Sequence, residues 1–177
     1  MPGSLSALTF QDHYQDNLSD VLEYDPENAK KLLEDAGYSE GSDGIYEKDG
    51  EKLSLRYVLV GDDEVSKTTA SAVQSMLRAI GVDLRIEERP ASEFANILEE
   101  RDFDLFLSAV GVTSPYSGIV YFEQSFGSDS NLDLSSTGSA EFDEKIKEMQ
   151  QLDTKEAQIE RANELETEVF ERYGHLP

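Results

Sequence analysis

The sequence predicts an α/β fold built around a parallel sheet. Three segments with strand-like patterns, 52–60, 82–88 and 104–110, alternate along the chain with helical patterns. Strands separated by helices usually pair in parallel, because each helix carries the chain back to the same end of the sheet. Residues 104–110 are apolar on both faces, as expected for a strand that is buried on both sides. The length of 177 residues predicts one domain of ordinary size.

The first regular element is expected at 26–36, after an extended lead-in over 1–23 that shows little periodicity. Asp25 suits the N-cap of this helix, and Pro26 suits its first position. Gly37 suits the position just beyond the helix end, where a left-handed backbone is common. These three residues therefore fix both ends of the predicted helix.

A hairpin and the first strand of the parallel sheet come next. Asp49-Gly50 between short extended runs is a typical hairpin turn. In 52–60 apolar and polar residues alternate, which indicates a strand. The following helix should begin at Asp62–Glu64, where carboxylates favour the positive end of the helix dipole, and end at Gly81. Its expected apolar stripe consists of Val65, Ala72, Val73, Met76, Leu77 and Ile80, with Thr69 on the same face.

The second half of the chain predicts a long loop between helices. After the strand at 82–88, Pro90 interrupts the pattern and a short helix with Phe94, Ile97 and Leu98 should follow. Residues 111–138 are rich in Gly, Ser and Thr, and loops of this length are usually functional or disordered. Apolar residues 119–122 favour one ordered, packed segment within that loop.

Two helices are expected to end the chain. Ser139 should cap the first, and Asp153 or Thr154 the second. The inward residues of the first are expected to be Phe142, Ile146 and Met149. Those of the second are expected to be Ile159, Ala162, Leu165, Val169, Phe170 and Tyr173.

The charge of the chain narrows the possible partners. Lys and Arg number 15 against 38 Asp and Glu, a formal net charge of −23. Nucleic-acid binders concentrate basic residues, so this class is not expected. Such a charge favours a soluble monomer.

The chain has no Cys, which excludes disulfides and thiolate metal sites. No apolar run approaches the roughly 20 residues that a membrane span needs. The first residues lack the pattern of a signal peptide, so we expect either a cytosolic protein or a piece of a larger one.

One short motif resembles a calcium loop. Asp129, Asn131 and Asp133 match its first three positions, but Leu134 stands where the loop needs Gly and Ala140 where it needs Glu. A solvated turn is therefore favoured over a calcium site. We expect no metal and no cofactor.

Catalytic constellations are also missing. His13 and His175 have no partner at helical spacing and are interpreted as surface residues. No nucleophile elbow or phosphate-binding loop is present. An enzyme is therefore not expected, and we assign no catalytic residue.

Much of the chain resembles one protein family. Residues 24–38, YDPENAKKLLEDAGY, resemble the YDPEKAKKLLEEAGY segment of family 5 extracellular solute-binding proteins, the peptide-binding and related receptors of ABC importers. Each match is weak alone, but the order and spacing of all of them make the resemblance specific from about Leu22 to Pro177. The further matches lie at Asp43-Gly44-Ile45, Lys48-Asp49-Gly50, Leu53-Ser54-Leu55, Ile80-Gly81-Val82, Phe103-Asp104-Leu105, Ser139 to Asp143, and the final helix before Tyr173-Gly174.

The resemblance implies that this chain is a fragment. Family members have two lobes joined by a hinge, and residues 24–177 would be most of the C-terminal lobe, truncated at its end. The implied fold is the parallel-sheet lobe of a periplasmic-binding-protein-like type II fold with additional C-terminal helices. The implied location is extracellular or periplasmic, with an envelope anchor in the full-length parent. The implied partners are a peptide or other small solute, the first lobe of the parent and an ABC permease.

The resemblance also places a candidate ligand site in the loop after the third strand. The family pattern there is roughly G-W-x-A-D-Y-x-D-P, and its first Asp pairs with the ammonium of a bound peptide in oligopeptide receptors. In this chain Val110 occupies the position of the Trp, and Thr113 occupies the position of that Asp. A neutral Thr hydroxyl cannot form the charge-assisted bond that a peptide ammonium makes with Asp, which argues against binding of a peptide amine in the usual way. The residues expected to face the ligand are Gly111, Thr113, Ser114, Tyr116 and Ser117.

Two alternatives to solute import remain at this point. The Gly- and Ser-rich stretches at 127–132 and 136–140 are similar to those of actinobacterial members. One branch of these is an envelope lipoprotein linked to lipoglycan synthesis, which implies a non-transport interaction role. The second alternative is a small acidic enzyme, which would need a metal or a buried carboxylate pair in a cleft.

Overall fold

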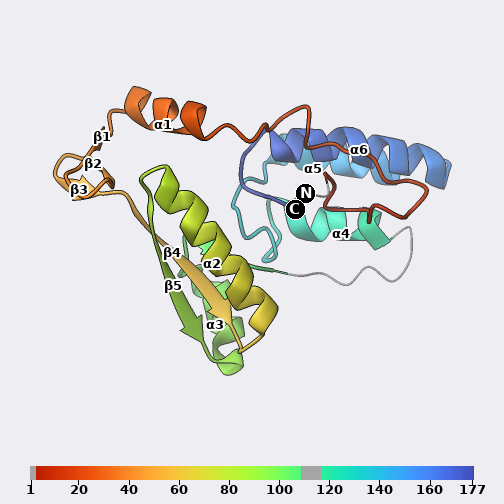
Figure 1. The fold of residues 1–177 in the computed structure, drawn as a ribbon. Helices are drawn as coiled ribbons and strands as arrows, with labels where there is room; N and C mark the ends of the chain where they lie inside the picture. The colour runs from red at the N-terminus through yellow and green to blue at the C-terminus, as the bar shows by residue number, and fades with distance from the viewer. Residues whose placement is uncertain (1–2, 109–116) are drawn as a thin grey trace. The chain divides into compact units, whose positions relative to one another are not determined.

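The computed structural model describes residues 3–108 and 117–177 (Figure 1). The chain forms two compact units where its length predicted one domain. One unit comprises Met1–Glu23 and Val110–Pro177, and the other comprises Tyr24–Ala109. Among the described residues, no helix is both long and apolar enough to cross a membrane.

The second unit begins with helix α1 (Pro26–Asp35), which confirms the first predicted helix. The Asp25 side chain caps it by accepting a hydrogen bond from the Asn28 amide at 2.9 Å, and Gly37 has the expected positive φ of 90°. An antiparallel sheet follows, made of β1 (Ser39–Glu40), β2 (Tyr46–Lys48) and β3 (Glu51–Lys52). Asp49 and Gly50 both have positive φ between β2 and β3, which confirms the hairpin.

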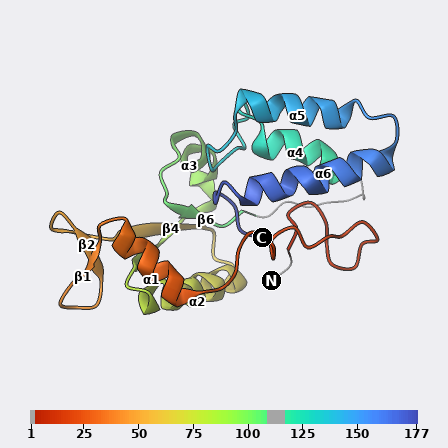
Figure 2. The same cartoon turned by 90° about the horizontal axis from the view of Figure 1, so that it is seen from above.

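The parallel sheet is confirmed (Figures 1 and 2). It contains β4 (Ser54–Val60), β5 (Asp83–Arg89) and β6 (Leu105–Phe106) in the order β5-β4-β6. Both pairings are parallel, with Tyr57 opposite Ile86 on one side and Leu105 on the other. Strand β6 is shorter than the predicted 104–110: Leu107 and Ser108 are described but lie outside the strand, and residues 109–110 lie outside the described ranges.

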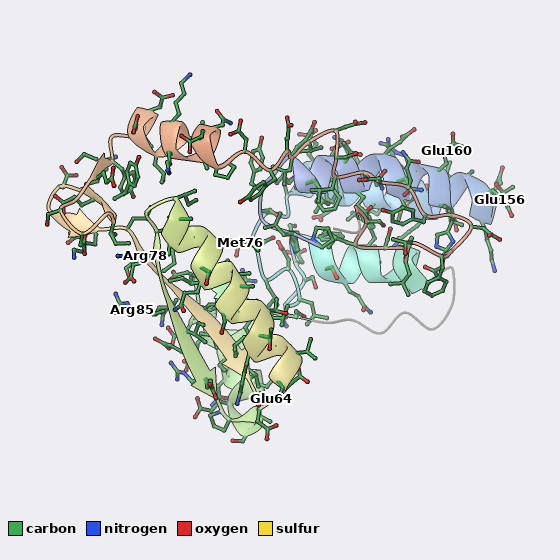
Figure 3. All side chains as sticks on the ribbon, in the orientation of Figure 1. Glu64, Met76, Arg78, Arg85, Glu156 and Glu160 are labelled. Carbon is green, nitrogen blue, oxygen red and sulfur yellow. The ribbon has the colours of Figure 1, made fainter. Side chains whose placement is uncertain are left out.

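Helix α2 (Glu64–Ala79) connects β4 to β5 and packs on one face of the sheet. Ala70 is fully buried there, and Val73 and Leu77 pack beside it against a cluster that includes Tyr57, Leu59 and Leu84. The predicted apolar stripe was therefore only partly correct. Its other residues are not buried: Val65 is 72% exposed and Met76, labelled in Figure 3, is 56% exposed, and Thr69 and Ala72 are exposed as well.

The opposite side of the sheet carries the next helix (Figures 1 and 2). After β5, a single turn of 3-10 helix (Ala91–Glu93) leads into α3 (Phe94–Glu100), as the interruption at Pro90 predicted. Ile97 of α3 is buried, and so is Val58 of β4, whose neighbours Tyr57 and Leu59 belong to the α2 side. Phe94 of α3 lies 6.2 Å from Phe106 of β6 between ring centroids, so α3 covers part of this face.

The other unit is helical, with α4 (Ser117–Phe126), α5 (Ala140–Gln150) and α6 (Lys155–Phe170). Ser139 and Thr154 cap α5 and α6 as predicted, each accepting a hydrogen bond at 3.2 Å from the amide three residues later. The predicted inward residues form the core, except Tyr173, which is 71% exposed because α6 ends at Phe170. The core cluster consists of Phe122, Phe126, Phe142, Ile146, Met149, Ala162, Leu165 and Val169.

Three features of this unit differ from the expectations. Residues 3–23 form successive turns instead of an extended lead-in. His175 is only partly exposed, because its ring centroid lies 4.9 Å from that of Phe126, and burial lowers its pKa despite the nearby charge of Asp133. Asp133, from the calcium-like motif, is buried and accepts hydrogen bonds from Ser135 Oγ and the Gly138 amide. Its carboxylate therefore holds its own loop together.

Candidate functional site

The carboxyl ends of the three parallel strands mark the candidate site. Because the strands are parallel, β4, β5 and β6 all end at the same edge of the sheet. The Gly61 amide donates a hydrogen bond to the Arg89 carbonyl at 2.9 Å and ties the ends of β4 and β5 together. Open α/β sheets bind their ligands at this edge.

A shallow depression of about 400 Å³ lies at this edge. Its lining comes from the residues that follow β4 and from the end of β5 and the turn after it. These residues are Gly61, Asp62, Glu88, Arg89, Pro90 and Ala91. Two carboxylates and one guanidinium thus stand beside a wall of Gly, Pro and Ala, which leaves room for a ligand to approach the backbone.

The side of the depression next to α2 is fixed by the cap of that helix. Asp63 accepts hydrogen bonds from the Ser66 amide at 2.7 Å and the Ser66 hydroxyl at 2.8 Å. These bonds lower the pKa of Asp63, so the carboxylate is charged at the positive end of the helix dipole. Lys67, one turn into α2, lies 3.3 Å from Glu88 and links the helix to β5.

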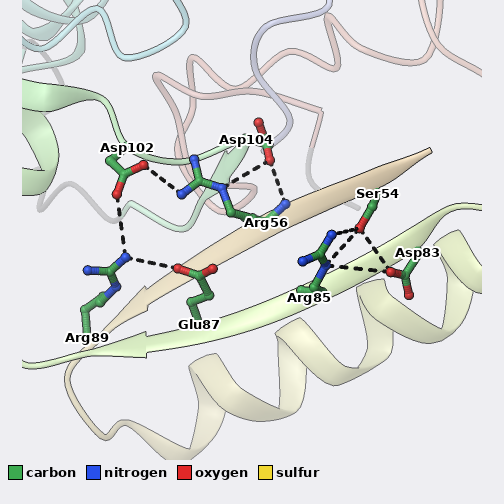
Figure 4. Close-up of polar contacts among 8 residues, drawn as sticks. All are labelled: Ser54, Arg56, Asp83, Arg85, Glu87, Arg89, Asp102 and Asp104. Atoms are coloured by element: carbon green, nitrogen blue, oxygen red, sulfur yellow. Dashed lines mark hydrogen bonds and ion pairs between the residues drawn. The ribbon is translucent and has the colours of Figure 1, made fainter. Parts of the chain in front are cut away.

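Arg89 at the end of β5 is surrounded by carboxylates (Figure 4). Its guanidinium lies 3.1 Å from Glu87, 3.4 Å from Glu93 and 3.5 Å from Asp102. The hydrogen bonds to Glu87 and Glu93 raise the pKa of Arg89. Its positive charge is therefore neutralised within the protein and is not free for an anionic ligand.

Arg56 of β4 continues this network on the same face of the sheet (Figure 4). Its side chain donates a hydrogen bond to Asp102 at 2.7 Å and lies 3.7 Å from Asp104. The Arg56 amide also donates to the Asp104 carboxylate at 2.7 Å. The Arg56 guanidinium lowers the pKa of Asp102, and the pair pins the turn between α3 and β6 onto the sheet.

The chemistry that these residues offer is ion pairing and hydrogen bonding. Within residues 3–108 and 117–177, no group of three or more His, Cys, Asp or Glu side chains is placed to hold a metal ion. Asp62, Glu88 and the backbone at Gly61 line the depression and can contact a ligand directly.

Of the five residues predicted to face the ligand, the structure describes only the backbone of Ser117. Gly111, Thr113, Ser114 and Tyr116 lie outside the described residues. Ser117 is the first residue of α4, and its side chain is also outside the description. Leu107 and Ser108, which follow β6 at the carboxyl edge, lead into this predicted loop. Their position agrees with the strand order on which the prediction depended.

The residues that line the depression were not among those predicted to face a ligand. A signal for them was present, because Gly61-Asp62 follows one predicted strand and Arg89-Pro90-Ala91 ends the next. Both segments lie at the carboxyl ends of predicted strands, where ligand-binding residues of open α/β sheets are expected.

Comparison with known proteins identifies the family. Residues 3–133 match the model of the bacterial extracellular solute-binding proteins, family 5 Middle. The chain belongs to this family. It is also 41% identical over 76 residues to the nickel-binding periplasmic protein of Escherichia coli, an alignment that covers 41% of this chain and 14% of that protein.

Solved structures of solute-binding proteins share the fold. The oligopeptide-binding protein AppA of Bacillus subtilis, in complex with a nonapeptide, superposes with a TM-score of 0.76 at 22% identity over 93% of this chain. NikA of Brucella suis, in complex with Fe(III)-EDTA, gives 0.75 at 24% identity over 92%. The chain spans only 33% and 34% of the lengths of these two proteins. The predicted α/β fold of a periplasmic binding protein is therefore confirmed.

Proposed function

We propose that this chain is the ligand-binding C-terminal lobe of the solute-binding protein of an ABC importer, and that its solute is a peptide. The parent protein captures the solute between two lobes and closes around a hinge. A membrane permease then recognises the closed form. The parent works outside the cytoplasmic membrane, held to the envelope by an anchor.

The single observation that carries this proposal is the position of the depression. It lies at the carboxyl edge of a parallel sheet in a chain that belongs to a solute-binding family. Leu107 and Ser108, after which the predicted ligand-facing residues come in sequence, follow β6 at that same edge. The depression is shallow and open, as expected for one wall of a cleft whose other wall comes from another lobe.

A nickel complex is the second candidate solute. The observation that favours it is the 41% identity over 76 residues to a nickel-binding protein. A chelated metal can be held by contacts to its chelator, and therefore does not require a cluster of ligating side chains in this lobe.

The test uses the full-length parent protein and isothermal titration calorimetry. The titrants are a peptide library and Ni²⁺ with free histidine. Ala91→Trp should fill the depression and weaken solute binding at least tenfold. The matched control is Ala72→Trp, which adds the same bulk on the exposed face of α2. Unchanged binding by Ala91→Trp would exclude this edge as the site, and binding of the nickel complex alone would replace the peptide as solute.

A further inference from the structure

A buried carboxylate in the helical unit has no part in the proposed binding site. Glu166 of α6 is fully buried. Its Oε1 accepts hydrogen bonds from the Leu5 amide at 2.9 Å, the Ser6 amide at 2.8 Å and Ser4 Oγ at 3.3 Å. Its Oε2 accepts one from Asn17 Nδ2 at 2.7 Å. All four donors belong to a segment about 150 residues or more distant in sequence.

These bonds close residues 3–17 into a loop, which we call the strap. The Asn17 amide donates to the Gly3 carbonyl at 2.8 Å, so the two ends of the strap meet. Asn17 Nδ2 donates in addition to Asn163 Oδ1, one turn before Glu166 on α6. Inside the strap, Tyr14 OH accepts a hydrogen bond from the Gly3 amide at 3.0 Å. Both ends of the strap are therefore held at one place on α6.

The attachment of the strap is mainly polar. Ala7 is buried and Leu5 packs against the helical core, but Leu8 is 49% exposed and Phe10 is 80% exposed. A segment with few buried apolar contacts opens more readily than the core beneath it. A buried carboxylate without its donors is strongly destabilised, so Glu166 and the strap depend on each other.

The strap also affects how the two units are connected. The chain passes between them twice, near residues 23–24 and near 109–110. The next described element after the second passage is α4 (Ser117–Phe126) of the helical unit. At the first passage, residues 18–25 join α1 to the strap, and the contacts that residues 3–23 make with α6 and the helical core hold that end of the connection. The polar bonds of Glu166 are central among these contacts.

We infer that Glu166 is a latch: it clamps the strap to α6 and thereby gives the two units a second point of attachment. When the latch is closed, the Tyr24–Ala109 unit is tethered at both of its ends. When the latch is open, it is tethered at one end only, and its motion relative to the helices is less restricted. The opening leaves the helices and the parallel sheet folded.

The first test is hydrogen exchange of the Glu166→Gln variant. Glutamine keeps the size of the side chain but removes the charge and one of the two acceptor oxygens that hold the strap. Exchange of the strap amides should accelerate at least tenfold, while the amides of β4 and α5 keep their protection. The control is Glu164→Gln on the same helix, an exposed residue paired with Arg161. Unchanged strap protection in Glu166→Gln would overturn the latch.

The second test measures the freedom of the units. The chain has no Cys, so Glu160→Cys on α6, labelled in Figure 3, and Thr68→Cys on α2 give two specific spin-label sites. Electron–electron resonance should give a broader distance distribution with Glu166→Gln than with Glu164→Gln. A strap that opens without broadening this distribution would refute the tethering role.

A substitution on the strap itself covers the case in which Glu166→Gln unfolds the helices. Asn17→Ala removes the donor to Glu166 and Asn163 without placing a new group in the core. Hydrogen exchange of the strap and the spin-label distance distribution are then measured on this variant. Faster exchange of the strap with a broader distribution supports the latch, and wild-type behaviour in either measurement overturns it.

Discussion

The ring of Tyr46 lies directly against Gly81, and the Tyr46 amide donates a hydrogen bond to the Gly81 carbonyl at 2.8 Å. Gly81 follows α2 with a φ of 81°, a left-handed conformation that suits glycine. The Tyr46 hydroxyl donates to Glu34 of α1 at 3.0 Å. One buried tyrosine thus joins α1, the antiparallel sheet and the end of α2, although these elements are far apart in sequence.

Gly81→Ala is therefore expected to destabilise the Tyr24–Ala109 unit. A Cβ at this position would overlap the Tyr46 ring and approach the Gly44 carbonyl to 3.0 Å. Overpacking of this kind costs about 1–3 kcal/mol, and a non-glycine residue in the left-handed region adds roughly 1 kcal/mol. Hydrogen exchange of the β4 amides in the wild type and the variant measures the loss in the free energy of unfolding.

Gly50→Ala is the matched control for this substitution. Gly50 has a φ of 84°, but no atom lies within 4 Å of its Cβ position. This variant should lose only the conformational contribution of roughly 1 kcal/mol. Equal losses at Gly50 and Gly81 would show that packing against Tyr46 contributes nothing.

The elements that were predicted correctly are those with local signals. Asp25 and Gly37 mark the ends of α1, and Asp49-Gly50 marks the hairpin, because caps and tight turns depend on a few adjacent residues. The parallel order of the strands followed from their alternation with helices. The burial of Glu166 could not be predicted, because its donors come from the distant segment 4–17.

The buried face of α2 shows a second limit of the sequence. Apolar residues occupy two neighbouring faces of this helix, one with Val65 and Met76 and the other with Val73 and Leu77. Only the sheet decides between them, and it covers the face that includes the small residue Ala70. The depression was missed for a similar reason, since its residues are brought together by the pairing of β4 with β5.

Arg56→Met should reduce stability most at neutral pH. In the folded protein Arg56 holds the pKa of Asp102 below its ordinary value of 3.8. A lowered pKa contributes stability above the ordinary value, and this contribution is lost as the pH falls through the folded-state pKa. The difference between the wild type and Arg56→Met should therefore shrink as the pH falls below 3.8. Urea denaturation between pH 3 and 7 follows this difference.

Arg85→Met provides the comparison for Arg56→Met. Arg85 lies opposite Arg56 on β5, but its side chain is 66% exposed and its nearest acid in an ion pair, Asp83, is 3.8 Å away. Exposed pairs at such distances contribute little. A larger pH-dependent loss for Arg85→Met than for Arg56→Met would contradict the assignment of the ion pair to Asp102.

The isolated 177-residue chain should bind peptides weakly or not at all. A ligand in a two-lobe cleft makes its contacts with both lobes, and one lobe alone leaves half of the ligand in water. Calorimetry with a peptide library measures this directly, and the full-length parent is the positive control. Submicromolar affinity of the isolated chain would rule out the two-lobe mechanism.

The parent protein is also expected to bind peptides without an acidic anchor at position 113. Thr113 stands where the resemblance places the Asp that pairs with a peptide ammonium. A charge-assisted bond is about twice as strong as a neutral one, and a neutral hydrogen bond contributes about 0.5–1.5 kcal/mol. Selection should therefore shift toward uncharged or N-blocked ligands, or toward ligands held by the other lobe.

The test of this expectation compares free and N-acetylated peptides with the full-length parent, and their affinities should agree within tenfold, which is about 1.4 kcal/mol. A nearby acid, such as Glu123 or Asp129, could replace the missing anchor. Glu123 already accepts a hydrogen bond from Gln150 Nε2 at 2.9 Å, which ties it to α5 and makes Asp129 the freer of the two. A loss of tenfold or more on acetylation that disappears in Glu123→Gln or Asp129→Asn would show that the anchor has moved and is not absent.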